Sequence, residues 1–373
     1  MKKICFVTAA RSEYGLLKWI MKDVRDSGLC EFQLIVTGSH LSKEQGHTID
    51  YILEDGFVID QIVEEVINTS SSEKIADAMG RLAQGMAKAY AALQPDYLVV
   101  LGDRYELLPI CNSAFVMGIP IIHFSGGDVT EGAIDDGIRN AVTMLAEYHF
   151  PGTRDAAANI IRMRGTDRHV WPVGEPGLDA FFRETLMTRE ALAADLGLDM
   201  DAKWGLMTYH PETRQTPEHN LQVVRDCMDV LLREEDLQTV ITYANADLGG
   251  DQINAYLEEM AKQHPRKIKV MPSLGHARYL SFMRQVCVVI GNSSSGIVEA
   301  PFLNIPVINI GDRQKGRYLC PNVLQCNTDI QSMENAFSQV REYHQDADDK
   351  RLQYWGDGHT GQKVLAILKD IVK

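Results

Sequence analysis

Short apolar segments rich in β-branched residues recur along the chain, and segments with helical periodicity separate them. Each is hydrophobic at nearly every position, as expected of a strand that is covered on both faces. Strands that alternate with helices predict an α/β fold with parallel sheets and right-handed crossovers. The predicted strands are 4–8, 32–37, 97–101, 120–124 and an edge strand at 148–150, followed by 204–209, 239–243, 268–271, 286–290 and 306–310.

The two sets of strands indicate two domains. A stretch with Pro172, Gly174, Pro176 and Gly177 separates them, so we predict a first domain at 1–172 and a second at 173–360. Long helices are expected at 71–93, which begins in a Thr/Ser cluster, and at 361–372. Two such sheets facing each other would direct the carboxyl ends of their strands to a central cleft, where open α/β sheets bind ligands.

Composition narrows the class of protein. The 373 residues are 45% hydrophobic and 24% charged, as in ordinary globular proteins. The net charge of −14 disfavours a nucleic-acid partner. We expect no membrane segment, because no apolar run approaches the roughly 20 residues that span a bilayer. We also expect a cytoplasmic protein with reduced core cysteines and no metal site, since the seven cysteines (5, 30, 111, 227, 287, 320 and 326) are scattered without a CxxC pair.

Polar residues follow nearly every predicted strand. One such residue is usually a turn or a helix cap, but eight polar loops at the same end of the strands are harder to explain by capping alone. They make this end of each sheet the predicted ligand-binding edge. The candidates there are Arg11, His40, Asp103, Arg104, Asp128, His210, Asn245, Asp247 and Arg313.

The loop at 291–296, Gly-Asn-Ser-Ser-Ser-Gly, is the strongest candidate anion site. Small residues let backbone N–H groups approach a phosphate, and the following helix adds its positive end. A serine-rich N-cap is the alternative interpretation of Ser293, Ser294, Ser295 and Gly296. Glu299 lies one turn further on, where it can accept hydrogen bonds from a ribose diol or simply face solvent. The loop has neither the P-loop lysine nor the GxGxxG spacing, and Arg11 and Arg313 are candidate partners of a diphosphate.

In this order and spacing, the motifs resemble the hydrolysing UDP-N-acetylglucosamine 2-epimerases of sialic-acid-type sugar synthesis. The resemblance spans essentially the whole chain. The motifs that carry it are 8–15 (TAARSEYG), 36–40 (VTGSH), 101–104 (LGDR), His123 with 126–128 (GGD), 134–139 (IDDGIR), 210–213 (HPET), 291–296 (GNSSSG), 310–317 (IGDRQKGR) and 354–358 (YWGDG).

The resemblance implies a GT-B-like pair of Rossmann-type domains, with UDP held mainly by the second domain. It implies release of UDP and a free sugar inverted at C2 (N-acetylmannosamine from UDP-N-acetylglucosamine), without metal or nicotinamide. It further implies a homodimer or homotetramer, with the helix at about 361–373 packed back on the first domain.

Such a reaction needs two acid–base groups. In an α-linked substrate the C1–O and C2–H bonds are antiperiplanar, so a base opposite the leaving group drives elimination to a glycal. A second group must then return the proton to C2 from the other face. By resemblance, Asp103 and Asp135 are essential carboxylates and His210 assists the departing phosphate. Asp128 and Glu131 are further candidates, and which carboxylate is the base stays open.

One departure from the family pattern affects the carboxylates. Relatives often have Glu where this chain has Ser125 or Asp128, and Glu131 is one candidate replacement. The 126–133 segment (GGDVTEGA) looks more like the branch that acts on 2,4-diacetamido-2,4,6-trideoxyglucose in legionaminic-acid synthesis. The primary expectation is UDP-N-acetylglucosamine, and the diacetamido sugar is the alternative. A GT-B glycosyltransferase that transfers a UDP-sugar and a non-catalytic nucleotide-sugar sensor are the alternatives from other classes.

Overall fold

The computed structural model describes residues 1–43, 47–67, 71–131, 134–245, 247–343 and 349–373. Contacts within the chain divide it into two units. Unit 1 comprises Met1–Val129, Asp135–Arg183 and Trp355–Lys373, and unit 2 comprises Thr130–Ile134 and Glu184–Tyr354. The domain limits of 1–172 and 173–360 stay predictions, and each unit is described by itself.

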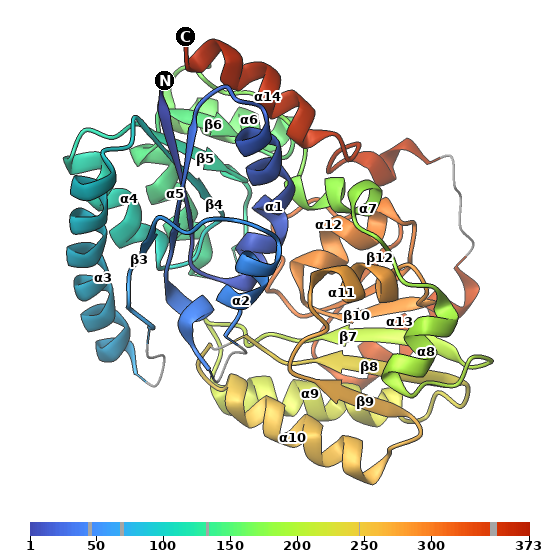
Figure 1. Ribbon diagram of the computed structural model, residues 1–373. Helices are drawn as coiled ribbons and strands as arrows, with labels where there is room; N and C mark the ends of the chain where they lie inside the picture. The colour runs from blue at the N-terminus through green and yellow to red at the C-terminus, as the bar shows by residue number, and fades with distance from the viewer. Residues whose placement is uncertain (44–46, 68–70, 132–133, 246, 344–348) are drawn as a thin grey trace. The chain divides into compact units, whose positions relative to one another are not determined.

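Unit 1 contains one parallel six-stranded sheet with helices on both faces (Figure 1). Its order is β3-β2-β1-β4-β5-β6. The predicted strands are confirmed, and β3 is an additional two-residue edge strand. The strands are β1 (Lys3–Thr8), β2 (Glu31–Val36), β3 (Gln61–Ile62), β4 (Tyr97–Leu101), β5 (Ile121–Phe124) and β6 (Tyr148–Phe150). The helices are α1 (Arg11–Asp26), η1 (Gly38–Leu41), α2 (Ile49–Glu54), α3 (Ser72–Leu93), α4 (Leu107–Val116), α5 (Asp135–Leu145), α6 (Arg154–Arg164), η2 (Pro176–Asp179), α7 (Ala180–Arg183) and α14 (Thr360–Ile371).

Unit 2 contains a second parallel six-stranded sheet, with the order β12-β11-β10-β7-β8-β9. All five predicted strands form, and β12 is an additional edge strand. The strands are β7 (Lys203–Thr208), β8 (Leu237–Thr242), β9 (Ile268–Met271), β10 (Val288–Gly291), β11 (Val307–Ile310) and β12 (Val323–Cys326). The helices are α8 (Arg189–Leu196), α9 (Pro217–Leu231), α10 (Gly250–Gln263), α11 (His276–Met283), α12 (Ser294–Phe302), α13 (Ile330–Glu342) and η3 (Lys350–Gln353).

Both sheets have the Rossmann strand order, in which the chain reverses direction across the sheet between its first and fourth strands. This switch point lies between β1 and β4 in unit 1 and between β7 and β10 in unit 2. Helices that follow neighbouring strands there diverge to opposite faces, which leaves the carboxyl ends accessible to a ligand. The fold thus identifies the loops after these four strands as the first places to look for a site.

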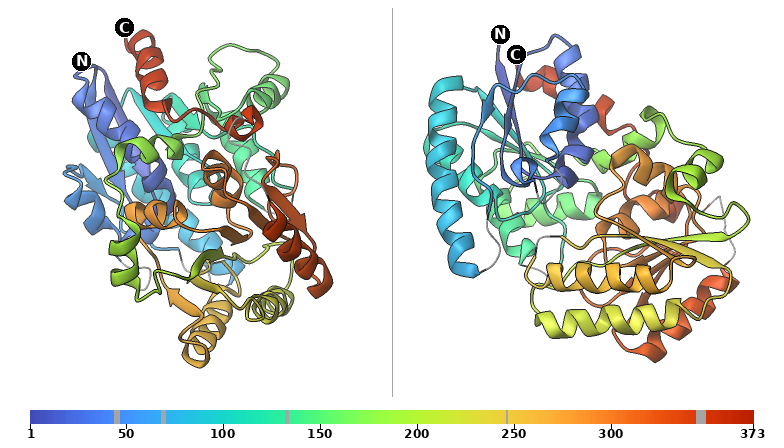
Figure 2. Two further views of the ribbon diagram at one scale, coloured as in Figure 1. Left: turned by 90° about the vertical axis from the view of Figure 1, so that its right-hand side faces the viewer. Right: turned by 60° about the horizontal axis from the view of Figure 1, so that its bottom comes forward.

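Successive side chains along each strand point to opposite faces of the sheet, and helices cover both faces. In β1, Cys5 and Val7 pack with α3, α4 and α5, whereas Ile4 and Phe6 pack with α1 and α14. In β7, Met207 faces the core formed with α9, α10 and α13, and Trp204 stacks on Phe282 of α11 at 5.5 Å between ring centroids. Figure 2 shows helices flanking each sheet from two further directions. Burial on both faces is the reason for the near-continuous hydrophobic segments.

The cysteines are free thiols, as predicted, but one was wrongly expected in the core. Cys287 is exposed, whereas the other six are buried. Cys287 immediately precedes β10. Its apolar neighbours Val286 and Val288 are buried, whereas its own side chain points outward. In the described part of the chain, no helix is long and apolar enough to cross a membrane.

The last helix, α14, completes unit 1. Val364 and Leu368 join the core beside α1, and the hydroxyl of Tyr97 donates to the carbonyl of Ile371 at 3.0 Å. Asp179, which is 2% exposed, accepts the N–H groups of residues 360 and 361 at 2.8 and 2.7 Å. These N–H groups belong to the first turn of α14 and have no partner within the helix. Asp179 therefore anchors the helix to the unit.

We predict that Asp179→Asn lowers the free energy of unfolding by about 1–3 kcal/mol, because the amide cannot accept both N–H groups as a carboxylate does. Denaturant unfolding followed by circular dichroism measures the loss. Asp357→Asn is the matched control, since Asp357 is half exposed and pairs with Lys363 on the surface. It should cost at most about 1 kcal/mol. Equal losses for the two variants would contradict the anchoring role.

Candidate active site

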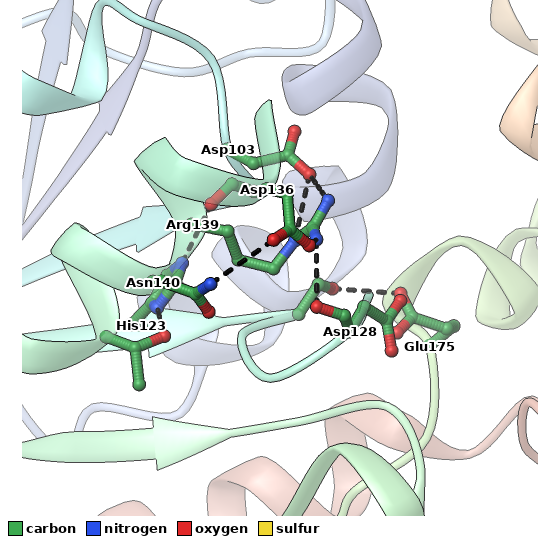
Figure 3. A network of polar contacts seen from close by, with 10 residues as sticks. Asp103, His123, Asp128, Asp136, Arg139, Asn140 and Glu175 are labelled. Carbon is green, nitrogen blue, oxygen red and sulfur yellow. Dashed lines mark hydrogen bonds and ion pairs between the residues drawn. The ribbon is translucent and has the colours of Figure 1, made fainter. Parts of the chain in front are cut away.

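A buried arginine joins the candidate acid–base loops of unit 1 (Figure 3). Arg139 on α5 is 1% exposed, and its Nε and Nη2 both donate to Oδ2 of Asp103, the former at 3.0 Å. Its Nη1 donates to the backbone carbonyl of Asp128 at 2.9 Å and to Oδ1 of Asp136 at 3.4 Å. One guanidinium thus connects the loop after β4, the loop after β5 and the first turn of α5.

The charge of Arg139 is compensated locally. Burial alone would lower its pKa, but Asp103, Asp128 and Asp136 outweigh that effect and raise the pKa above the usual value. The guanidinium is therefore charged at any relevant pH. Arg139 was not among the predicted site residues, although Asp136 and Arg139 are three residues apart and therefore lie on one helix face. That spacing was the available signal for their pairing.

The other predicted carboxylates, Asp128, Glu131 and Asp135, differ in their exposure to solvent and in their contacts. Asp135 begins α5 and is partly exposed, as is Asp128. Glu131 is exposed, and its backbone N–H donates to the carbonyl of Lys315 within unit 2 at 2.9 Å. Arg104, next to Asp103, donates from Nε to Glu106 at 3.3 Å. The structure therefore brings Asp103 and the Asp128 loop together, while the roles of Asp135 and Glu131 stay predictions.

His40 and His123 of unit 1 are fully buried and electrically neutral. His40 contacts the hydroxyls of Thr8 at 3.0 Å and Thr48 at 2.8 Å, one through each ring nitrogen. His123 donates from Nε2 to the carbonyl of Gly102 at 2.8 Å, directly beside Asp103. Burial lowers the pKa of each ring to about 4. His40 stays a predicted substrate ligand, but both its ring nitrogens are already engaged by threonines.

Glu13 stabilises the turn after β1, at the switch point of the first sheet. Its Oε2 accepts the N–H groups of Ala9 and Ala10 at 2.9 and 3.2 Å, which positions the exposed residue Arg11 at the start of α1. Glu13 is 5% exposed, and its Oε1 has no hydrogen-bond partner among the described residues. Burial, with a contribution from the charge of Glu106, raises the pKa of Glu13 to about 8.

In unit 2, the corresponding switch point positions His210. The side chain of Asn292 binds the backbone of His210 twice, accepting its N–H at 2.7 Å and donating to its carbonyl at 2.9 Å. The ring Nδ1 of His210 accepts the backbone N–H of Asn245 at 3.0 Å. A neutral imidazole in this position carries its proton on Nε2. The loops after β7, β8 and β10 therefore meet at one histidine with a defined tautomer.

The backbone of Asn292 also holds the loop after β11. Its carbonyl accepts hydrogen bonds from Nη1 of Arg313 at 3.2 Å and from Nε2 of Gln314 at 2.9 Å. Glu212, which is 3% exposed, accepts the N–H of Asp312 at 2.8 Å. Arg313 is consequently adjacent to the serine loop.

The serine loop begins with a glycine that no other residue can replace. Gly291 has φ +121°, and a Cβ there would lie 2.0 Å from the carbonyl oxygen of Thr208. Ser293 is the N-cap of α12, and its Oγ accepts the N–H of Ser295 at 3.4 Å. Ser295 also contacts the hydroxyl of Tyr279 at 2.5 Å, whereas Ser294 is exposed. The capping interpretation is thus realised, and it leaves the first turn of α12 facing the β7–β10 switch point.

The remaining predicted ligands are partly buried. Burial raises the pKa of Glu299 to about 7, against a smaller opposing effect of Arg317. Asn245 and Asp247 lie in the loop after β8, on either side of residue 246, which the structure does not describe. No three His, Cys, Asp or Glu side chains are grouped as metal ligands in the regions that the structure describes.

Comparison with known proteins assigns the chain to a family. The family model described as UDP-N-acetylglucosamine 2-epimerase matches residues 22–369. The chain belongs to this family. It is 32% identical to the GDP/UDP-N,N'-diacetylbacillosamine 2-epimerase (hydrolyzing) of Campylobacter jejuni, over 91% of this chain and 87% of the relative. It is 30% identical to the UDP-N,N'-diacetylbacillosamine 2-epimerase (hydrolyzing) of Legionella pneumophila, over 100% and 96% of the two chains.

A solved structure confirms the fold of this epimerase-family chain. The UDP-GlcNAc 2-epimerase of Methanocaldococcus jannaschii, in complex with UDP-GlcNAc and UDP, superposes with a TM-score of 0.83 at 17% identity. The match covers 99% of each chain. The expected GT-B-like architecture of two Rossmann-type sheets is therefore confirmed.

We predict that Glu13 makes stability fall as pH rises between about 4.5 and 8. The folded pKa of about 8 lies above the ordinary value of 4.5, so the folded state binds the extra proton in this range. The contribution is complete below the unfolded pKa and is lost as pH rises through the folded pKa. Urea unfolding at pH 5.5 and 8.5 should show a larger loss in the unmodified chain than in Glu13→Gln, which does not titrate. The same pH dependence in both would contradict the prediction.

We also predict that Arg139→Met lowers the free energy of unfolding by about 3–5 kcal/mol, because it leaves the carboxylates of Asp103 and Asp136 without their buried partner. Arg81→Met is the matched control. Arg81 is half exposed and pairs with Glu65 and Asp77 on the surface, so its loss should cost much less stability than the loss of Arg139. Denaturant unfolding compares the two variants. A loss for Arg139→Met no larger than that of the control would contradict the buried linkage.

Proposed function

We propose that this chain is a hydrolysing 2-epimerase whose substrate is UDP-2,4-diacetamido-2,4,6-trideoxyglucose, the nucleotide sugar called UDP-N,N'-diacetylbacillosamine. The products are UDP and the free sugar inverted at C2. The carrying observation is that relatives 32% and 30% identical, aligned over nearly the whole chain, bear this activity in their names. UDP-N-acetylglucosamine is the second candidate, favoured by the description of the family model.

The proposed chemistry of unit 1 is proton transfer at C2. Elimination of UDP removes the C2 proton on one face of the ring, and hydration of the glycal requires its return on the other. We assign Asp103 as one acid–base group, because Arg139 fixes its carboxylate through Oδ2. Asp135 is the second carboxylate, and Asp128 and Glu131 supplement them. Carboxylates also stabilise the positive charge that develops at C1 as the bond to UDP breaks.

The proposed role of His210 is to assist the departing diphosphate. Its Nδ1 accepts a hydrogen bond from the backbone N–H of Asn245, so the neutral ring carries its proton on Nε2. A donor of this kind stabilises the negative charge on the leaving oxygen and can transfer a proton to it. The tautomer supports this role, because the ring does not need to be positively charged to donate.

Unit 2 also supplies the proposed nucleotide site. We assign the diphosphate to the first turn of α12, with Ser293, Ser294, Ser295 and Gly296, because helix N-termini present unpaired N–H groups to anions. Arg313, held beside this turn by Asn292, adds positive charge. Glu299 is assigned to the ribose hydroxyls.

Further parts of the proposal rest on the sequence. Arg11, Arg104, His40, Asn245 and Asp247 are the additional substrate-binding residues that it includes. The reaction as proposed uses no metal or nicotinamide. A homodimer or homotetramer in the cytoplasm stays a prediction.

We predict that incubation with the UDP-diacetamido sugar in D2O yields free UDP and a free manno-configured sugar carrying deuterium at C2, as read by proton NMR. The kcat/KM for this substrate should exceed that for UDP-N-acetylglucosamine by about 10-fold or more, the range that small substituents supply. The GDP-linked sugar is tested as a third substrate, because the name of the Campylobacter relative includes both nucleotides. Asp103→Asn should lower kcat by about 100-fold or more.

Several products would contradict this proposal. A UDP-linked sugar inverted at C2 indicates a non-hydrolysing epimerase. A sugar that keeps its C2 hydrogen and is transferred to an acceptor indicates a glycosyltransferase. Full turnover of the folded Asp103→Asn variant would show that Asp103 is not an acid–base group of the reaction.

A further inference from the structure

A buried carboxylate, that of Glu175, contacts the loop that carries Asp128. Ser125 follows β5 directly, and its Oγ donates to Oε2 of Glu175 at 2.9 Å (Figure 3). Ser125 has φ 56°, a left-handed conformation that non-glycine residues adopt only at some cost. Such a conformation persists where surrounding contacts hold it. The bond to Glu175 is a contact of this kind.

The position of Glu175 is itself determined by the fold. The residue is 7% exposed, and its backbone N–H donates to the carbonyl of Trp355 at 2.8 Å. Its carbonyl accepts the hydroxyl of Thr360 at 3.4 Å. A Cβ on Gly152 would lie 1.8 Å from Oε1 of Glu175, so the carboxylate occupies space that only a glycine leaves. Burying a carboxylate at this position costs more free energy than burying an apolar side chain would.

The turn that begins at Ser125 is held at its other points as well. The carbonyl of Gly127 accepts Nδ2 of Asn159 at 2.8 Å, and the carbonyl of Asp128 accepts Nη1 of Arg139 at 2.9 Å. Arg139 in turn binds the carboxylate of Asp103. Glu175 therefore holds the start of the turn and Arg139 holds its end. The same set of contacts determines where Asp103 and Asp128 lie relative to each other.

We propose that Glu175 is a positioning residue for the acid–base site, acting through Ser125 on the turn that carries Asp128. This inference rests on the proposed function, because it assigns Glu175 to the geometry of that reaction. It differs from a catalytic role, since Glu175 acts as a hydrogen-bond acceptor and not as a proton carrier. A displacement of about 1 Å in a reacting group can cost on the order of 100-fold in rate.

Steady-state kinetics of Glu175→Ala, Glu175→Gln, Ser125→Ala and the double alanine variant test this role. Glu175→Ala should lower kcat by about 10- to 100-fold with KM changed by less than about threefold. Glu175→Gln should recover most of kcat, with an unchanged pH profile, because its amide oxygen can still accept the hydroxyl of Ser125. The double variant should lose no more than the larger single loss, since both changes remove one interaction.

Asp179→Asn is the matched control, because Asp179 is an equally buried carboxylate of the same unit that contacts only α14 in the hydrogen bonds described above. It should lower stability without changing kcat of the folded protein. Unchanged kcat in Glu175→Ala, a Gln variant as inactive as the Ala variant, or additive losses in the double variant would overturn the inference. A loss of kcat in Asp179→Asn equal to that in Glu175→Ala would also overturn it.

Hydrogen exchange separates failure of this inference from failure of the proposed function. If the unmodified chain releases no UDP from any of the nucleotide sugars, the proposed function fails. The positioning of the turn is then measured by amide exchange of the peptide covering 121–131. Faster exchange there in Glu175→Ala, but not in Asp179→Asn, supports the positioning role, and unchanged exchange overturns it.

Discussion

The candidate chemistry of unit 1 depends on a guanidinium that is withdrawn from water. An isolated buried charge costs several kcal/mol, so Arg139 is tolerated only because two carboxylates and a backbone carbonyl accept its hydrogen bonds. Those groups are drawn from three separate segments: Asp103 after β4, the carbonyl of Asp128 after β5, and Asp136 on α5. The need to satisfy one charge therefore brings the loops together. Carboxylates that would otherwise repel one another can be close because Arg139 lies between them.

In unit 2 the corresponding loops are joined by an uncharged residue, Asn292. Asn292 is fully buried, and its side-chain amide bonds the backbone of His210, while its backbone carbonyl accepts hydrogen bonds from Arg313 and Gln314. A neutral connector suits a loop that is proposed to bind a diphosphate, since a carboxylate there would repel the ligand. The two sheets share one topology. They differ in the charge of the residue that joins loops at the carboxyl ends of the strands, and this difference matches the proposed division of labour between proton transfer and anion binding.

The fold class followed from local pattern, whereas the contacts that organise the site did not. Strands covered on both faces produce continuous hydrophobic segments, and these were recognised throughout. The short edge strands β3 and β12 were not, because Gln61 and Gln325 interrupt their apolar character. Arg139 and Glu175 were missed for a different reason. Their partners Asp103 and Ser125 lie 36 and 50 residues away, and no periodicity within one element reports such a pair.

The two predicted histidines differ in how the structure holds their rings. His40 and His210 both follow strands, and both were predicted to bind or act on substrate. The ring of His40 lies between two threonine hydroxyls, and burial lowers its pKa to about 4, so both its ring nitrogens are engaged within unit 1. The Nδ1 of His210 accepts a backbone amide, which leaves Nε2 as the protonated nitrogen of the neutral ring. An amide donor cannot rotate away as a hydroxyl can, so the neutral ring of His210 keeps one tautomer. A fixed donor suits the role proposed for His210 in the departure of the diphosphate.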